Sequence, residues 1–237
     1  MFDVIGIYHT YWLVILLPRE EILSLIPDGY SLAPINSWPA ECQSLVASPE
    51  HHPLLLEIGK QHDSGPQLTR WLRADFGEAK VSVPFVLLPA RFSTTRPFVY
   101  KRNIYLTRRY LAWSSWAFFG LNSEMSSIAM SETNARVKTG QDTAIDADIE
   151  EGAPAENMEG MKRMFTGIFV GDGSSYGEFA GDVRLLRSVK GVVRFGKGMG
   201  KLEGGEMPAR GVEVEYKYVL RGPKPISSLQ DSSERAG

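Results

Sequence analysis

The sequence predicts a mostly β protein of the α+β class, built on an antiparallel, closed or cone-like β-barrel with a few short helices. Three observations predict this class. Short runs rich in β-branched and aromatic residues recur along the chain. They are separated by turn residues, since the chain holds 23 glycines and 14 prolines. No amphipathic helical pattern extends beyond about three turns.

The first elements are a strand and a helix. Val14–Leu17 is an apolar run that ends at Pro18. Residues 18–26 then favour a short helix, because proline is tolerated in the first turn and acidic residues there interact well with the helix dipole. Pro27, Asp28 and Gly29 end this helix with turn-forming residues. Further strands are predicted at residues 44–47, 54–58, 81–88, 98–106, 165–170, 183–189 and 212–220.

The last predicted strand has the clearest pattern. Val212, Val214, Tyr216 and Tyr218 alternate with polar residues, which is typical of an antiparallel strand with one buried face. We therefore expect one domain over residues 1–220. The Pro/Ser-rich end, 221–237, is expected to be a disordered tail, and the acidic segment 142–159 a solvated loop.

Composition indicates a globular protein with a sizeable core. Of 237 residues, 43% are hydrophobic and 23% charged, and the net charge is −2. This balance gives no general attraction to nucleic acid or to an anionic membrane, so we expect neither partner. The apolar run Tyr11–Leu17 is far shorter than the ~20 residues of a membrane-spanning helix. With Cys42 as its single cysteine, the chain fits a reducing, cytoplasmic location.

Motifs for cofactors are incomplete. Gly191–Lys197 has most of a phosphate-binding loop, but Gly198 follows where a Ser or Thr should bind magnesium, and no helix-forming stretch comes next. The histidines His51, His52 and His62 lie near Glu57, but their spacing does not converge on one point of a strand. We therefore expect neither a metal nor a cofactor.

One polar turn is the most distinctive feature of the chain. The aromatic segment Tyr110–Phe119 leads into Gly120–Met125, and a small-residue segment follows. Upstream, Glu57 ends a short apolar strand. In their order and spacing over about the first 135 residues, these landmarks resemble the acetoacetate decarboxylase superfamily. The resemblance implies a pocket inside a β-barrel and a small carbonyl substrate.

The resemblance also implies a loss at the centre of the site. The lysine that forms a Schiff base in the family falls at Ser123, and a second lysine that lowers the pKa of the first falls at Glu124. Since a Schiff base needs an amine, imine chemistry is excluded at this turn. A lysine from elsewhere, such as Lys101 or Lys60, would have to reach in.

The residues left at the turn suggest acid–base chemistry instead. If Glu57 and Glu124 faced each other in an apolar pocket, they could share a proton, one acting as base and the other as acid. Ser123 and Asn122 could donate hydrogen bonds to an enolate oxygen, and Arg109 could hold a ligand carboxylate. The pocket lining would come from aromatic and sulfur side chains, for which ordinary core packing is the alternative: Trp113, Trp116, Phe118, Phe119 and Met125.

The sequence thus favours a cofactor-independent, lyase-like enzyme. It would act on a β-keto or polyketide-like substrate by decarboxylation, dehydration or cyclisation, in a setting such as secondary metabolism. Two alternatives stay open: a catalytically silent binder of small molecules, and a structural subunit of a homo-oligomer. A bell-shaped pH–rate profile that is abolished by Glu57→Gln would distinguish the enzyme from the binder.

Overall fold

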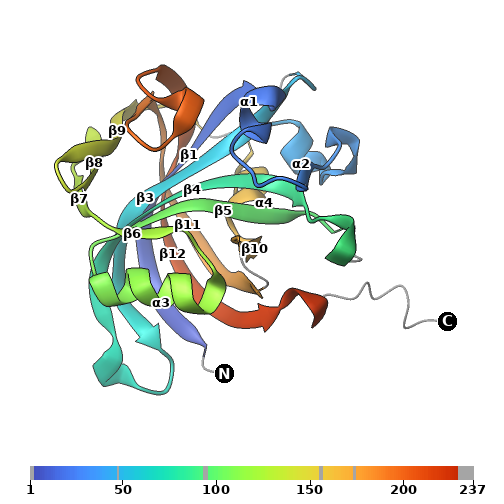
Figure 1. The fold of residues 1–237 in the computed structure, drawn as a ribbon. Helices are drawn as coiled ribbons and strands as arrows, with labels where there is room; N and C mark the ends of the chain where they lie inside the picture. The colour runs from blue at the N-terminus through green and yellow to red at the C-terminus, as the bar shows by residue number, and fades with distance from the viewer. Residues whose placement is uncertain (1–2, 47, 93–95, 155–156, 173–174, 229–237) are drawn as a thin grey trace.

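The computed structural model describes residues 3–46, 48–92, 96–154, 157–172 and 175–228 (Figure 1). Strands dominate, so the mostly β class is confirmed. The strands are β1 Val4–Pro18, β2 Ser31–Leu32, β3 His51–Pro66, β4 Ala74–Leu87, β5 Phe98–Leu106, β6 Ser123–Met125, β7 Ser127–Met130, β8 Asn134–Thr139, β9 Asp142–Glu151, β10 Gly167–Val170, β11 Ser175–Phe195 and β12 Glu206–Pro225. The α-helices are α1 Arg19–Leu23, α2 Ala40–Gln43, α3 Arg109–Phe119 and α4 Met158–Phe165.

The pairing of the strands closes on itself. The sheet runs in the order β10-β5-β4-β3-β1-β12-β11, and β10 also pairs with β11. The sheet continues from β11 through β9, β8 and β7. Most pairs are antiparallel, but β10 and β6 both lie parallel to β5. The observed arrangement is therefore a ring of strands, while a closed or cone-like barrel stays a prediction about its shape.

The two faces of the ring carry separate cores. Alternate residues of a strand point to opposite faces, so Leu13 and Ile15 join one cluster, and Trp12 and Val14 join another. The second face is the inside of the ring. This follows from the contact between β4 and β11, which are not neighbours in the sheet: Lys80 Nζ lies 4.9 Å from the centroid of the Phe179 ring.

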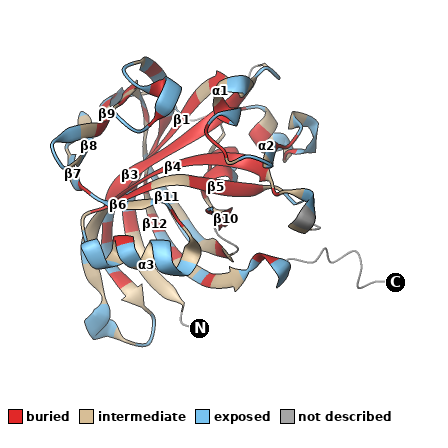
Figure 2. Cartoon of the chain, in the orientation of Figure 1, coloured by how far each residue is buried: buried red, intermediate tan, exposed pale blue. Residues whose placement is uncertain are grey.

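Each face is covered differently. Strands β8 and β9, at the upper left in Figure 1, join the outer cluster through residues such as Val137 and Ile145. The inner cluster includes Met161, Met164 and Phe165 from α4. Strands β1, β3 and β4 are buried along most of their central residues, whereas α3 exposes much of its surface (Figure 2).

Helix α3 positions the polar turn that the sequence singles out. The helix ends at Gly120, whose φ of 63° is the left-handed conformation that glycine adopts without steric cost. Leu121 then returns to the core at 4% exposure. The next residues form β6, whose Ser123 lies beside Ile104 of β5.

Three expectations about particular segments need comment. The helix expected over 18–26 is present as α1, with a shorter span. The acidic segment 142–159 is not a loop over its described residues, because β9 and the start of α4 occupy most of it; the acidic residues of β9 lie at exposed or half-buried positions of the strand. Residues 221–228 continue β12 and a 3-10 turn instead of forming a tail, and residues 229–237 lie outside the described residues.

Among the residues that the structure describes, no helix combines the length and apolar character needed to cross a bilayer.

Candidate functional site

Four buried charged side chains meet inside the ring. Lys101 Nζ lies 2.8 Å from Glu57 Oε1, and Lys80 Nζ lies 3.5 Å from Glu57 Oε2. Lys80 Nζ also lies 2.8 Å from Glu78 Oε2. Their side chains are 9% exposed or less. We call Glu57, Glu78, Lys80 and Lys101 the charged cluster; its formal charges balance.

Strand register places these residues together. Glu57 of β3 lies opposite Lys80 of β4, so both point into the ring. The pairing of β4 with β5 shifts between Ser82–Lys101 and Val81–Asn103, which leaves Arg102 as an extra residue. Such a bulge re-aims the side chains beside it, and here it keeps both Lys101 and Ile104 on the inner face.

The two lysines differ in their electrostatic surroundings. Burial lowers the pKa of Lys101, and the nearby Lys80 lowers it further, which outweighs the effect of Glu57. For Lys80, burial also acts to lower the pKa, but Glu57 and Glu78 together raise it above the ordinary value. Lys101 is therefore the amine that loses its proton more readily.

Glu57 stays ionised between the two lysines. Burial alone would raise the pKa of its carboxyl group, but the charges of Lys101 and Lys80 outweigh burial and lower the pKa below the ordinary value. Burying four charges costs several kcal/mol per ion unless each is paired, and a hydrophobic core would need none of them. Strongly perturbed groups of this kind are typical of functional sites.

Aromatic rings surround the lysines. Lys80 Nζ lies 4.6 Å from the centre of the Tyr8 ring, and Lys101 Nζ lies 5.9 Å and 6.0 Å from the Phe169 and Phe179 rings. Gly59 makes room for Tyr8, because a Cβ at this position would lie 2.7 Å from Tyr8 Cε2. Tyr8 can then donate its hydroxyl hydrogen to the Glu78 carbonyl oxygen at 3.0 Å.

Glu78 connects the cluster to a buried polar network. Gln61 Nε2 donates to Glu78 Oε2. Ser64 Oγ donates to Gln61 Oε1 at 2.9 Å, and the Tyr218 hydroxyl bonds to both Gln61 and Ser64. Each of these side chains forms a hydrogen bond with at least one neighbour, so the Glu78 end of the charged cluster is held in place.

A cavity of about 390 Å³ opens at this end of the ring. Its polar lining includes Gln61, Ser64, Glu78 and Tyr218 from the strands and Ser114 and Ser115 from α3. Its other lining residues are mostly apolar and come from strand ends and from α3: Val4, Phe76, Leu106, Leu111, Phe118, Phe119, Phe179 and Leu220. An apolar cavity with a few converging polar groups is the usual form of a small-molecule site.

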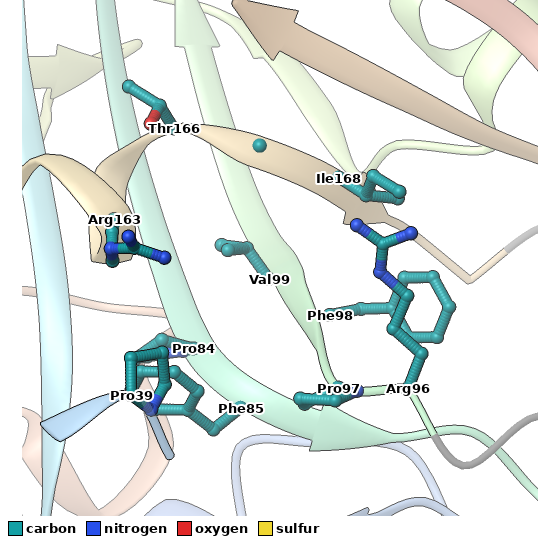
Figure 3. A pocket seen from close by; sticks show the side chains of 11 residues that line it. Pro39, Pro84, Phe85, Arg96, Pro97, Phe98, Val99, Arg163, Thr166 and Ile168 are labelled. Carbon is teal, nitrogen blue, oxygen red and sulfur yellow. The ribbon is translucent and has the colours of Figure 1, made fainter. Parts of the chain in front are cut away.

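A second cavity of about 300 Å³ lies between α4 and β5 (Figure 3). Pro84, Phe98 and Val99 line it, and the guanidinium groups of Arg96 and Arg163 flank it. Arg163 already forms ion pairs with Glu41 and Glu159. Glu78 is the member of the charged cluster that lines the 390 Å³ cavity, and no member lines this second one, so we place the candidate site at the 390 Å³ cavity.

The structure does not bring Glu57 and Glu124 together. Opposite residues Glu57, Lys80, Ile104 and Ser123 follow one another across β3, β4, β5 and β6 on one face. Glu124 is the next residue after Ser123, so it points to the other face, where it is exposed. The carboxylate that shares a lysine with Glu57 is Glu78.

The other polar residues of the turn are used locally or face water. The Ser123 hydroxyl donates to the Ala112 carbonyl oxygen of α3 at 2.7 Å. Asn122 is exposed, and its carbonyl oxygen accepts from the Ile104 backbone N–H. Both residues thus attach α3 and the turn to β5 instead of pointing a side chain at the charged cluster.

The expected lining residues divide into two groups. Phe118 and Phe119 line the 390 Å³ cavity, and Phe119 also lies 5.8 Å from the Phe169 ring. The remaining expected lining residues are 58–62% exposed: Trp113, Trp116 and Met125. Arg109 is exposed too, beside Trp113 at an open depression on α3. An eleven-residue helix lying on a surface has one inward face, which is why the aromatics separate.

Sequence reasoning missed Lys80 and Glu78. The available signal was Glu78-Ala-Lys80 at alternate positions of a strand that is otherwise apolar, which places both charges on one buried face. Lys101 was one of two lysines named only as examples that would have to reach in from elsewhere, with no sequence signal for either, and the structure places it inside the ring. Lys60, the other, is exposed.

Comparison with known proteins identifies the fold. No protein-family model and no curated protein matches the chain. Solved structures do. The enduracididine biosynthesis enzyme MppR complexed with pyruvate matches with a TM-score of 0.60 and 12% identity over 94% of this chain and 90% of that one. An acetoacetate decarboxylase-like enzyme from Sphingomonas wittichii RW1 gives 0.63 and 10%, over 94% and 92%. Acetoacetate decarboxylase from Legionella pneumophila gives 0.60 and 10%, over 92% and 87%.

These structural matches show that the chain has the acetoacetate decarboxylase-like fold. The resemblance expected from the turn and the upstream glutamate is confirmed at the level of the fold. At this identity the likeness establishes the fold alone.

Proposed function

We propose that this protein is a small-molecule enzyme that activates a carbonyl substrate at the Lys101–Glu57 pair. One observation carries the proposal: a buried lysine whose pKa is lowered lies 2.8 Å from a buried carboxylate that stays ionised. Such a lysine reaches its nucleophilic, neutral form at a lower cost than an exposed one. The family expectation of carbonyl chemistry is thereby kept, but the reactive group comes from β5 and not from the turn at Ser123.

The proposed reaction proceeds through an imine on Lys101. The neutral Lys101 amine attacks the carbonyl carbon to give a carbinolamine, which takes up one proton from solvent and loses water to give a protonated imine. The imine then accepts the electron pair of a bond on the carbon next to the imine carbon. In a 3-oxo acid this is the C–COO⁻ bond, with release of CO₂; in a 2-oxo acid it is a C–H bond, with transfer of the proton to Glu57. Reprotonation and hydrolysis return the free amine. Lys80 holds Glu57 ionised through these steps, since it stays protonated at higher pH than Lys101.

Short oxo acids are the substrates that this proposal favours. The matching structure of MppR contains pyruvate, and the cavity of about 390 Å³ suits a small molecule. Its mostly apolar lining would exclude water from an enolate or enamine. Whether the reaction ends in decarboxylation, dehydration or cyclisation, each would use the same first step.

A second candidate keeps Glu57 and Glu78 as acid–base groups without an imine. It is favoured by Glu78, which lines the cavity and contacts Lys80. In this mechanism the lysines stabilise an enolate oxygen by charge alone. A silent binder and a homo-oligomeric structural subunit also stay predictions.

Reductive trapping distinguishes these functions. The protein is incubated with pyruvate and then with sodium borohydride, and the modified peptide is identified by mass spectrometry. We expect a reduced adduct on Lys101 that is absent in Lys101→Met, while Lys60→Met, which changes an exposed lysine, still forms it. Turnover of an oxo acid without any adduct would favour the acid–base mechanism. If the protein shows no turnover of an oxo acid and forms no adduct, the proposed enzymatic function is contradicted.

A further inference from the structure

Three polar groups on the inner face have no hydrogen-bond partner among the described residues. They are Trp12 Nε1, Ser82 Oγ and the Tyr216 hydroxyl. Trp12 and Ser82 are 0% exposed, and Tyr216 is 3% exposed. A buried polar group without a partner gives up its hydrogen bonds to water and gains none, so most such groups in proteins are paired. Three on one face call for an explanation by function.

All three lie next to the charged cluster. Trp12 of β1 is opposite Glu57 of β3, and Ser82 of β4 is opposite Lys101 of β5. Tyr216 lies with its ring centre 5.8 Å from that of Trp12. Burial raises the pKa of Tyr216, and the negative charge of Glu57 raises it further. The Tyr216 hydroxyl therefore stays protonated and can donate.

This region offers more donors than acceptors. Trp12 Nε1 can only donate, and Lys101 Nζ has three donor positions of which one is used, by Glu57. Both Glu57 oxygens are occupied by lysines. The groups left over are thus best satisfied by an acceptor that carries several lone pairs, such as a carboxylate.

The position of these groups suits the inner end of a ligand. Val4 and Tyr218 line the 390 Å³ cavity, and Trp12 and Tyr216 lie further along the same strands β1 and β12 on the inner face. Beyond them, the Phe165 ring of α4 stacks on Trp12 at 4.9 Å and closes the site. A ligand entering from the cavity would reach these donors last.

We propose that Trp12 and Tyr216 form a carboxylate-binding subsite for a 2-oxo acid whose carbonyl group lies at Lys101. This inference rests on the proposed function and names its substrate class. In a 2-oxo acid the carboxylate is bonded directly to the carbonyl carbon, so one small ligand satisfies both sets of groups. Ser82 beside Lys101 supplies a further hydroxyl to the same oxygens.

Calorimetric binding of pyruvate to the whole chain tests the subsite. We expect Tyr216→Phe and Trp12→Phe each to weaken pyruvate binding by about tenfold or more, the typical effect of losing a hydrogen bond to a charged group. The matched controls are Tyr176→Phe and Trp38→Phe, which change buried rings outside the charged cluster. Both controls should bind pyruvate as the parent does. Thermal unfolding confirms folding; Tyr216→Phe removes an unpartnered hydroxyl and should not lower the melting temperature.

Acetone, which has the carbonyl but no carboxylate, separates this inference from the proposed function. Borohydride trapping of acetone on Lys101 should be equal in the parent and in Tyr216→Phe. Three results would overturn the subsite: the parent does not bind pyruvate, the variants bind pyruvate as the parent does, or the variants lose acetone trapping as well as pyruvate binding. Unchanged pyruvate binding would mean that these groups only hold buried water. Absence of acetone trapping in the parent would instead count against imine formation, even where pyruvate binding behaves as expected.

Discussion

Lys101 and Glu57 form a buried ion pair in which the nitrogen and the nearest carboxylate oxygen are 2.8 Å apart, with side-chain exposures of 2% and 4%. Removing one partner of such a pair leaves the other charge without compensation in a region that excludes water. The same burial that makes the pair costly also lowers the pKa of Lys101. Stability and reactivity of this protein are therefore coupled at these two residues.

Glu57→Gln should destabilise the fold strongly. Two lysines would lose the carboxylate between them, and breaking a buried pair typically costs about 3–5 kcal/mol of unfolding free energy. Urea unfolding at neutral pH measures this difference. The control is Glu206→Gln, which removes an exposed partner of Arg194 and should change the unfolding free energy little. Equal effects of the two substitutions would contradict the assignment of Glu57 to the buried cluster.

Glu78, and not Glu124, should matter for catalysis. Glu78 contacts Lys80 and lines the cavity, whereas Glu124 is exposed on the opposite face of the sheet. We expect Glu124→Gln to retain the kcat/KM of the parent within about twofold and Glu78→Gln to lose at least tenfold, since acid–base and electrostatic groups typically contribute 10²–10⁴-fold. Steady-state kinetics, with the oxo acid that gives an adduct in the borohydride experiment, measures kcat/KM of both variants. The reverse order would restore the pair of glutamates expected from the sequence.

His52 should make the fold sensitive to acid. The ring is buried, and burial lowers its pKa to about 4 from an ordinary 6.5. A group whose folded-state pKa is depressed stabilises the fold above its unfolded pKa, and this contribution is lost as pH falls through the folded value. Between pH 6.5 and 4 the loss amounts to about 3 kcal/mol, at about 1.4 kcal/mol per pKa unit.

The measurement for His52 is the unfolding free energy over that pH range. Nε2 of His52 contacts the Pro84 carbonyl oxygen at 2.7 Å, so His52→Gln can keep a donor while removing the titrating group. We expect this variant to flatten the pH dependence, and His62→Gln, at an exposed position, to leave it unchanged. An unaltered slope in His52→Gln would mean that other groups cause the acid sensitivity.

Gly59→Ala should disturb both the sheet and Tyr8. A Cβ at this position would lie 2.3 Å from the His9 carbonyl oxygen and 2.6 Å from Thr10 Cβ, and backbone atoms cannot move aside cheaply. We expect a loss of roughly 1–3 kcal/mol or more in unfolding free energy, as for other overpacked sites. At Gly205 the nearest atom to such a Cβ is a methionine methyl at 3.5 Å, so Gly205→Ala is the control. A tolerated Gly59→Ala would show that β1 and β3 do not pack this closely.

Much of the fold could be predicted from the sequence because its signals are local. Alternation in Val212–Tyr218 and turn residues between apolar runs indicate strands without knowledge of their partners. The closure of the ring through β10 could not be predicted this way, since β10 has only four residues and one of its two partners, β5, lies more than 60 residues earlier in the chain. The acidic β9 was missed because its charges suggested solvent, although they occupy only the exposed face of a strand.

The candidate site could be predicted only in part. Glu57 was found because the family resemblance has a landmark there, a short apolar strand that carries an acid near its end. Its partners were not, because a bulge at Arg102 and the register of three strands decide that Lys80 and Lys101 meet it, and register depends on long-range pairing. Ser123 and Glu124 drew attention as the positions of the family's lysines. In the structure, the Ser123 hydroxyl donates to the Ala112 carbonyl oxygen of α3, and Glu124 faces solvent.

The account depends most directly on Lys101 being the buried lysine that loses its proton more readily, and the ¹⁵Nζ titration of the lysines by NMR measures this. The Lys101 and Lys80 signals are assigned with Lys101→Arg and Lys80→Arg. We expect the Lys101 signal to titrate below the ordinary lysine pKa of about 10.4 and the Lys80 signal above it. A Lys101 signal that titrates at or above the ordinary value would contradict the proposed nucleophile.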